Sequence, residues 1–171
     1  MKPGLSLLAA CLALAYVGAA SAAAMHAIAR LEPTKGNTAT GSVLFNQQDG
    51  KVKVRVHLTG LTPGSTHGIH VHENGDCSSG DGKSAGGHFN PTGASHGPPD
   101  GPHHAGDMPN VTADQSGEVS ANFEITGFTV GSGNTDIIAK SVILHADPDD
   151  YKTQPAGNSG DRIACGVIKA S

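Results

Sequence analysis

The residues of this sequence best suited to chemistry are its histidines. The 171-residue chain has ten of them, and seven lie between positions 67 and 104. His70 and His72 are separated by one residue in a segment with the alternation of a β-strand, where such side chains point to the same face. Two imidazoles placed in this way can bind one metal ion, although a solvated polar strand face is the commoner arrangement for such a pair.

Further candidate ligands follow this pair along the chain. Single histidines recur every eight residues, a carboxylate lies three residues beyond the last of them, and one more histidine ends a distant apolar strand: His88, His96, His104, Asp107 and His145. Imidazole suits copper and zinc, and an added carboxylate suits tetrahedral zinc. The alternative is a surface histidine tract that binds metal loosely, but such tracts rarely place a single histidine inside an apolar strand.

The elements that must position these residues are predicted to be strands and turns. With 24 Gly, 10 Pro and 37% apolar residues, the composition excludes a helical bundle and a membrane-spanning protein. Short apolar or alternating runs predict strands over residues 25–31, 43–45, 51–58, 67–73, 118–125, 141–145 and 162–168. Such strands indicate an antiparallel sandwich or barrel. His57 falls on the polar face of its strand and is not expected to bind metal.

Two long segments, residues 74–111 and 146–161, show no strand pattern. Loops of this length within a compact domain are usually functional or disordered. Because the first is rich in Gly, Pro, Ser and Asp, burial of apolar surface alone would not hold it in place. We therefore expect cross-links, either covalent or through metal ions, to fix it.

Residues 1–22 have the pattern of a secretory signal peptide. Lys2 precedes an apolar run from Leu5 to Val17, and a small-residue site ends at Ala22. We therefore expect export and a mature domain over residues 23–171. A lipid-attachment box ending at Cys11 is the alternative, which we set aside because the apolar run continues past it. The net charge of −4 becomes −5 once Lys2 is removed, which argues against nucleic-acid binding.

Loss of the leader leaves two cysteines, Cys77 and Cys165. An even count in an oxidising compartment predicts one disulfide. It would close a loop of roughly 90 residues and stabilise the fold by about 4 kcal/mol on the chain-entropy model. Two buried free thiols are the alternative.

Four stretches of the chain together resemble the copper/zinc superoxide dismutases, in particular their bacterial periplasmic members. They are Gly68–Glu73, Gly86–Pro91, His104–Asp107 and Gly160–Ile168, and the match runs in order through residues 26–170. The resemblance implies an eight-stranded antiparallel Greek-key β-barrel or sandwich, immunoglobulin-like, with two long functional loops. It also implies dismutation of superoxide to dioxygen and hydrogen peroxide by a redox-cycling copper bridged to zinc, as antioxidant defence in the periplasm.

The same resemblance implies one copper and one zinc per chain. The implied copper ligands are His70, His72, His88 and His145. The implied zinc ligands are His88, His96, His104 and Asp107, so His88 would bridge the two ions. His104 is preferred to His103 because of its spacing to Asp107.

Other residues take supporting roles by the same resemblance. Asp149 would link His70 to His96, since a metal-bound imidazole needs an acceptor for its other N–H; Asp147 and Asp150 are close enough to be alternatives. His67 would be structural. Arg162 would orient the superoxide anion beside the copper, and His88 would deliver a proton to the nascent peroxide.

The resemblance also indicates which partners to expect. Superoxide is the expected substrate, and neither nucleic acid nor, after removal of the leader, a membrane is an expected partner; the chain could be a monomer or a homodimer. Lys83 and Lys152 are candidates for attracting the substrate. The Asn110-Val111-Thr112 sequon is expected to be incidental.

Competing functions are a copper-storage module, which needs neither zinc ligands nor Arg162, and a zinc hydrolase, for which no general base is evident. A cupredoxin would need a cysteine ligand.

Overall fold

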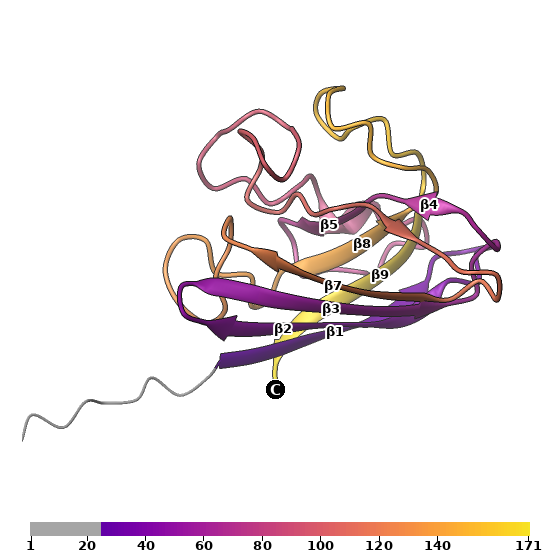
Figure 1. Cartoon of the computed structure of the whole chain (residues 1–171), viewed down its shortest axis with the longest axis horizontal. Helices are drawn as coiled ribbons and strands as arrows, with labels where there is room; N and C mark the ends of the chain where they lie inside the picture. The colour runs from indigo at the N-terminus through magenta and orange to yellow at the C-terminus, as the bar shows by residue number, and fades with distance from the viewer. Residues whose placement is uncertain (1–24) are drawn as a thin grey trace, which may run out of the picture.

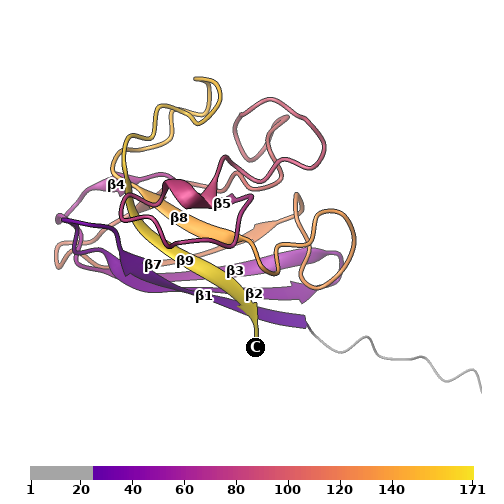
Figure 2. The same cartoon turned by 180° about the vertical axis from the view of Figure 1, so that it is seen from behind.

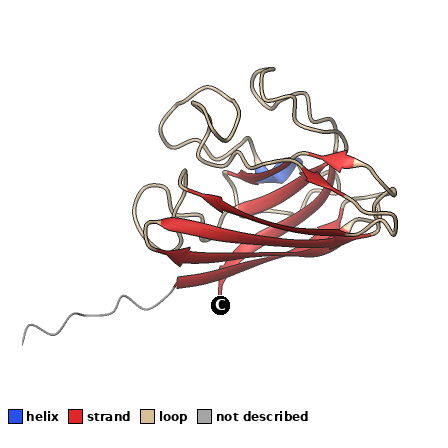
Figure 3. Cartoon of the chain, in the orientation of Figure 1, coloured by secondary structure: helices blue, strands red, loops and turns tan. Residues whose placement is uncertain are grey.

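The computed structural model describes residues 25–171, and the predicted leader, residues 1–22, lies outside them. The described residues form nine strands and one short 3₁₀ helix, η1 (Figures 1 and 3). The elements are β1 (Met25–Pro33), β2 (Thr40–Gln48), β3 (Lys51–Thr59), β4 (Thr66–His67), β5 (Ile69–His72), η1 (Lys83–Ala85), β6 (Val111–Thr112), β7 (Val119–Ile125), β8 (Ser141–His145) and β9 (Arg162–Ala170). Within this part of the chain, no helix has the length and apolar character needed to cross a bilayer.

Seven strands form one antiparallel sheet in the order β5-β8-β9-β1-β2-β3-β7, and β4 pairs with β6 in a separate ladder. The non-consecutive neighbours, such as β9 beside β1, are crossovers of the Greek-key kind. The all-β prediction is confirmed. The expected count of eight strands is reached when β4 and β5 are taken as one strand interrupted at Gly68, whose carbonyl still accepts a hydrogen bond from His145 N.

The sheet curls so that β5, β8 and β9 lie over β1, β2, β3 and β7 (Figure 1). Strict alternation along β3 explains how the core forms, because Val52, Val54, Val56 and Leu58 are almost fully buried while the residues between them are exposed. His57 is one of these exposed residues, as predicted. The rings of Phe45 and Phe128 meet edge to face in the same core, with centroids 5.8 Å apart.

Two loops rise from the same end of the molecule, residues 73–110 between β5 and β6 and residues 146–161 between β8 and β9 (Figures 1 and 2). The second has its predicted bounds, and the first differs from the predicted 74–111 by one residue at each end. β5 ends the order of the large sheet, so one of its edges has no strand beside it. The first loop fills that edge: Val71 N donates to Gly106 O, and Val71 O accepts from Phe89 N, at 2.9 and 2.8 Å. Edge pairing therefore holds parts of a loop that has little apolar content.

Candidate metal centre

Alternation along β5 separates its apolar side chains from its histidines. Ile69 and Val71 belong to the hydrophobic core, whereas His70 and His72 face the long loops, and all four residues are buried. His145 ends β8, the strand paired with β5. His88 comes from the first loop, bridged to His72 across the edge of β5. The strand pairing thus brings residues from three parts of the sequence together.

These residues form a first cluster. One ring nitrogen from each of its members lies within 4.8 Å of the others, and the members are His70, His72, His88 and His145. The second nitrogen of three rings is fixed by an acceptor. His70 Nε2 donates to Asp149 Oδ2 at 2.8 Å, His72 Nδ1 donates to Gly86 O at 3.0 Å, and His145 Nδ1 reaches Gly160 O at 3.4 Å. These contacts leave His70 Nδ1, His72 Nε2 and His145 Nε2 facing one another.

A second cluster adjoins the first and shares His88 with it; its members are His88, His96, His104 and Asp107. Asp107 is fully buried, and its Oδ1 lies 2.7 Å from His88 Nδ1 and 3.4 Å from His104 Nδ1. Its Oδ2 lies 3.0 Å from His96 Nδ1 without hydrogen-bond geometry, and accepts the main-chain N–H of His104 at 3.0 Å. His88 therefore offers Nδ1 to the second cluster and Nε2 to the first.

The unpartnered atoms of the two clusters test whether metal ions fit them. Among residues 25–171, five buried side-chain polar atoms have no hydrogen-bond partner, and four are imidazole nitrogens of these clusters: His70 Nδ1, His88 Nε2, His96 Nδ1 and His104 Nδ1. A buried polar atom without a partner is costly and calls for an explanation. Converging nitrogens beside a carboxylate are the donor set that copper and zinc take, so these residues fit both ions.

Burial also sets the protonation of the rings. Loss of solvation, reinforced by the neighbouring imidazoles of His88 and His145, holds the pKa of His70 and of His72 well below the usual histidine value. Burial lowers the pKa of His145 to about 4. Burial alone would raise the pKa of Asp107, but the hydrogen bond from His88 and the neighbouring imidazoles lower it overall. At neutral pH His70, His72 and His145 are therefore neutral and Asp107 is anionic, which are the forms that bind cations.

Asp149 joins the two clusters from the second loop. Its Oδ2 accepts from His70 Nε2 at 2.8 Å, its Oδ1 accepts from His96 Nε2 at 2.9 Å, and its carboxylate is fully buried. The alternatives do not share this position. Asp150 is exposed and caps its own turn through Thr153, and Asp147 bonds to Gly68 through its main chain.

The remaining histidines of the crowded region lie outside both clusters. His67 is buried, with Nδ1 donating to the carbonyl of His145 at 2.8 Å and Nε2 lying 2.6 Å from Ser65 Oγ. His67 thus supports the main chain of a cluster residue, in line with the structural role expected for it. His103 is half-buried and donates to Gly101 O.

Arg162 is the first residue of β9 and pairs with His145 in the register of β8 and β9. Its guanidinium is half-buried and donates to Gly82 O at 2.9 Å and to Gly86 O at 2.7 Å. Gly86 O is also the acceptor for His72, so one carbonyl serves the cation and a cluster imidazole. The arginine side chain is therefore held in a defined direction beside the first cluster.

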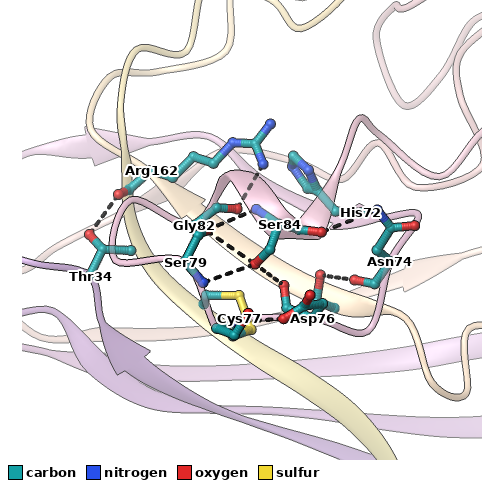
Figure 4. The surroundings of a disulfide bond; sticks show 12 residues. Thr34, His72, Asn74, Asp76, Cys77, Ser79, Gly82, Ser84 and Arg162 are labelled. Atoms are coloured by element: carbon teal, nitrogen blue, oxygen red, sulfur yellow. Dashed lines mark hydrogen bonds between the residues drawn. A yellow bond between two sulfur atoms is a disulfide. The ribbon is translucent and has the colours of Figure 1, made fainter.

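The predicted disulfide is confirmed, since Cys77 and Cys165 are bonded with their Cα atoms 5.7 Å apart (Figure 4). Cys165 lies on β9 three residues after Arg162. Cys77 lies at the start of the segment whose carbonyls bind the guanidinium, and Figure 4 shows that segment between the disulfide and Arg162. The cross-link thus ties the acceptors of the guanidinium to the strand that carries it.

Two hollows open beside the pair formed by His145 and Arg162. One, of about 220 Å³, is lined by His145 and by residues 153–156 and 158–160 of the second loop. The other, of about 460 Å³, is lined by Arg162, Lys35 and Lys83, with Asp81 and Asp161 at its wall. Lys83 is exposed and pairs with Asp81 at 3.0 Å, whereas Lys152 is exposed and lines neither hollow.

Sequence reasoning missed the side chains that fix this arrangement from outside the clusters. Asn110 was considered only as part of a sequon, yet its Nδ2 donates to Asp149 O and its Oδ1 accepts from Asp149 N, both at 2.9 Å. Gln154 forms a similar pair with His96. Neither residue has a spacing or composition that marks such a contact, because each partner lies dozens of residues away in the sequence.

Comparisons with known proteins agree with the site. A family model described as copper/zinc superoxide dismutase matches residues 39–168. The chain is 40% identical over 151 residues to superoxide dismutase [Cu-Zn] 2 of Aquifex aeolicus, covering 85% of this chain and 87% of that protein. It is 40% identical over 145 residues to superoxide dismutase [Cu-Zn] of Deinococcus radiodurans, covering 77% and 78%. The crystal structure of the clock protein EA4 superposes with a TM-score of 0.76 at 41% identity, over 84% of this chain and 93% of that one.

Proposed function

This chain belongs to the copper/zinc superoxide dismutase family, and we propose that its two histidine clusters are the centre at which it converts superoxide to dioxygen and hydrogen peroxide. The observation that carries the proposal is His88, a single buried ring that faces both clusters, with Nε2 unpartnered on one side and Nδ1 at Asp107 on the other. One imidazole can bridge two ions only from such a position.

We assign the first cluster to copper and the second to zinc. Four imidazole nitrogens suit copper, and three imidazoles with one carboxylate suit zinc in tetrahedral geometry. Copper supplies the one-electron redox chemistry that the reaction requires, whereas zinc has no redox chemistry of its own. Asp149 orients one ring of each site by accepting its outer N–H.

The residues of the chain supply binding, orientation and protons. The reaction takes two superoxide anions and two protons to one dioxygen and one hydrogen peroxide. Arg162 carries a fixed charge beside His145, and its planar fork of donors suits a small anion. When it is not bound to copper, His88 Nε2 would hold a proton and pass it to the peroxide product, because this atom faces the first cluster without any other partner.

The test is consumption of enzymatically generated superoxide by the metal-loaded chain and two variants. His145→Ala removes a ligand of the first cluster, and we expect it to abolish activity. His57→Ala removes an exposed imidazole from the outer face of β3 and should leave activity unchanged. Equal activity of the wild type and His145→Ala would contradict the assignment of the first cluster.

We also propose that residues 1–22 direct export and that the mature chain acts in the periplasm. The signal-peptide pattern of the sequence and the disulfide between Cys77 and Cys165 support this location, since disulfides persist in oxidising compartments. Fractionation of a bacterial host that expresses the whole sequence, with N-terminal sequencing of the product, tests it. We expect a periplasmic chain that begins at Ala23. A cytoplasmic chain, or a membrane-bound one that begins at Cys11, would contradict the proposal.

A further inference from the structure

Gln154, an exposed residue of the second loop, binds the main chain of the first loop. Its Oε1 accepts the main-chain N–H of His96 at 2.9 Å, and its Nε2 donates to the carbonyl of His96 at 2.8 Å. The two residues are 58 positions apart in the sequence. A carboxamide has both a donor and an acceptor, so one side chain can satisfy both polar groups of a residue's main chain.

The ring of His96 is held by the same loop. Its Nε2 donates to Asp149 Oδ1 at 2.9 Å, and both side chains are fully buried. Gly157 packs against this bond so closely that a Cβ at that position would overlap Asp149 Oδ1 and press on His96 Nε2. Main chain and ring are thus fixed together, which leaves Nδ1 of His96, a buried nitrogen without a hydrogen bond, beside Asp107.

We propose that Gln154 is a positioning residue for the second metal site: its two bonds to the His96 main chain keep the His96 ring between Asp149 and Asp107 before an ion enters. The inference rests on the proposed assignment of His96 as a zinc ligand. Without Gln154 the main chain of His96 can move within a Gly- and Pro-rich loop, and the ring must be ordered when the ion binds. The loss should therefore appear as weaker metal binding, as for other residues that orient ligands.

The chain provides a matched control in Gln47. This half-buried glutamine of β2 also makes two main-chain contacts, donating to Lys51 O at 3.0 Å and accepting from Val130 N at 2.9 Å. Neither partner belongs to a cluster. Gln154→Ala and Gln47→Ala therefore remove the same kind of interaction, and only the first removes it from a candidate ligand.

The experiment is a titration of the full-length, metal-stripped wild type and both variants with Co²⁺, in competition with a chelator and followed by visible absorption. We expect Gln154→Ala to raise the dissociation constant of the tetrahedral Co²⁺ site roughly tenfold and to shift its absorption bands, while Gln47→Ala matches the wild type. If Gln154→Ala has the Co²⁺ affinity and the absorption bands of the wild type, the positioning role of Gln154 is overturned, whereas the assignment of the second cluster to zinc is not affected. A wild type that binds no Co²⁺ would overturn the zinc assignment and with it this inference.

A second measurement needs no metal. The main-chain N–H of His96 should exchange with solvent faster in metal-free Gln154→Ala than in the wild type, because Gln154 Oε1 is its acceptor. Gln154→Glu keeps an acceptor for that N–H and loses the donor to His96 O, so we expect a smaller loss of Co²⁺ affinity. If the melting temperature of Gln154→Ala is far below that of Gln47→Ala, the Co²⁺ affinity of Gln154→Glu is compared with that of the wild type instead. Unchanged exchange of the His96 amide in Gln154→Ala would contradict the proposal.

Discussion

At the scale of single residues, the chemistry depends on which nitrogen of each ring is left without a partner. His70 is bonded through Nε2 and His72 through Nδ1, so the two rings of one strand offer opposite nitrogens to the same cluster. A strand alone would present both rings in parallel. The acceptors, Asp149 and Gly86 O, therefore determine the ligand geometry as much as the histidines do.

Asp149→Asn tests this dependence. The amide keeps the shape of the carboxylate, but its NH₂ group would face an N–H of His70 or His96, so one ring loses its acceptor. We expect metal affinity to fall roughly ten- to a hundredfold, measured by chelator competition. Asp150→Asn changes the exposed neighbouring carboxylate and should have no such effect. An equal loss in both variants would contradict the role of Asp149.

Arg162→Lys tests the proposed role of Arg162 in orienting superoxide, since it keeps the charge and removes the fork that binds Gly82 O and Gly86 O. We expect kcat/KM for superoxide to fall roughly tenfold, which corresponds to about 1.4 kcal/mol of transition-state binding. Metal content, measured by elemental analysis, should stay at the wild-type level. Full activity of this variant would show that a positive charge at this position is sufficient and that the planar guanidinium is not needed.

At the scale of elements, the edge of β5 that has no neighbouring strand positions the first loop, which carries several cluster residues. Gly106 and Phe89 of the first loop hydrogen-bond to the N–H and the carbonyl of Val71 on this edge, and Gly106 lies so close that a Cβ would overlap Val71 O. We expect Gly106→Ala to lower the free energy of unfolding by about 2 kcal/mol and to reduce retention of both metals, measured by denaturant titration and metal analysis. Gly87→Ala, in the same loop but with room for a methyl group, is the control. Equal stability of the two variants would contradict the edge-pairing account.

The disulfide acts on the same scale, because it ties the segment that carries Gly82 and Gly86 to β9. Replacing both Cys77 and Cys165 by serine should lower the free energy of unfolding by about 4 kcal/mol on the chain-entropy model. Activity should fall in the still-folded variant, since the acceptors of Arg162 lose their anchor. If kcat/KM is unchanged in that variant, the disulfide contributes to the stability of the fold and not to the positioning of Arg162.

The sequence predicted most of the elements but not all of them. β8 has the predicted bounds, and β3 and β9 differ from theirs by one and two residues. β3 shows strict alternation, whereas β8 is a short apolar run that is buried throughout. The two-residue β6 (Val111–Thr112) is too short to show a period, and Gly68 divides a strand predicted to be continuous. The cluster residues followed from types and spacing, whereas Asn110 and Gln154 act through contacts between distant loops, for which local sequence carries no signal.

At the scale of the whole molecule, the net charge opposes the substrate. The chain carries −4, so an anion must be attracted by local cations, and Arg162, Lys35 and Lys83 line one hollow. We expect kcat/KM to fall with rising ionic strength, because salt screens this local field. A rate that rises with salt would show that the overall negative charge dominates.

Lys83→Glu tests the same field with one residue. We expect kcat/KM at low salt to fall roughly threefold. Lys51→Glu makes the same change in net charge on the β2–β3 hairpin and should have a smaller effect. Equal losses in the two variants would assign the effect to net charge instead of to the hollow.

The measurement that most directly tests two adjacent ions sharing His88 combines metal analysis with electron paramagnetic resonance on the reconstituted chain. We expect one copper and one zinc per chain, and a cupric signal that superoxide bleaches. In His88→Ala the shape of that signal should change, since the ring faces both clusters. Uptake of no more than one ion per chain, or a cupric signal that superoxide leaves untouched, would contradict the account.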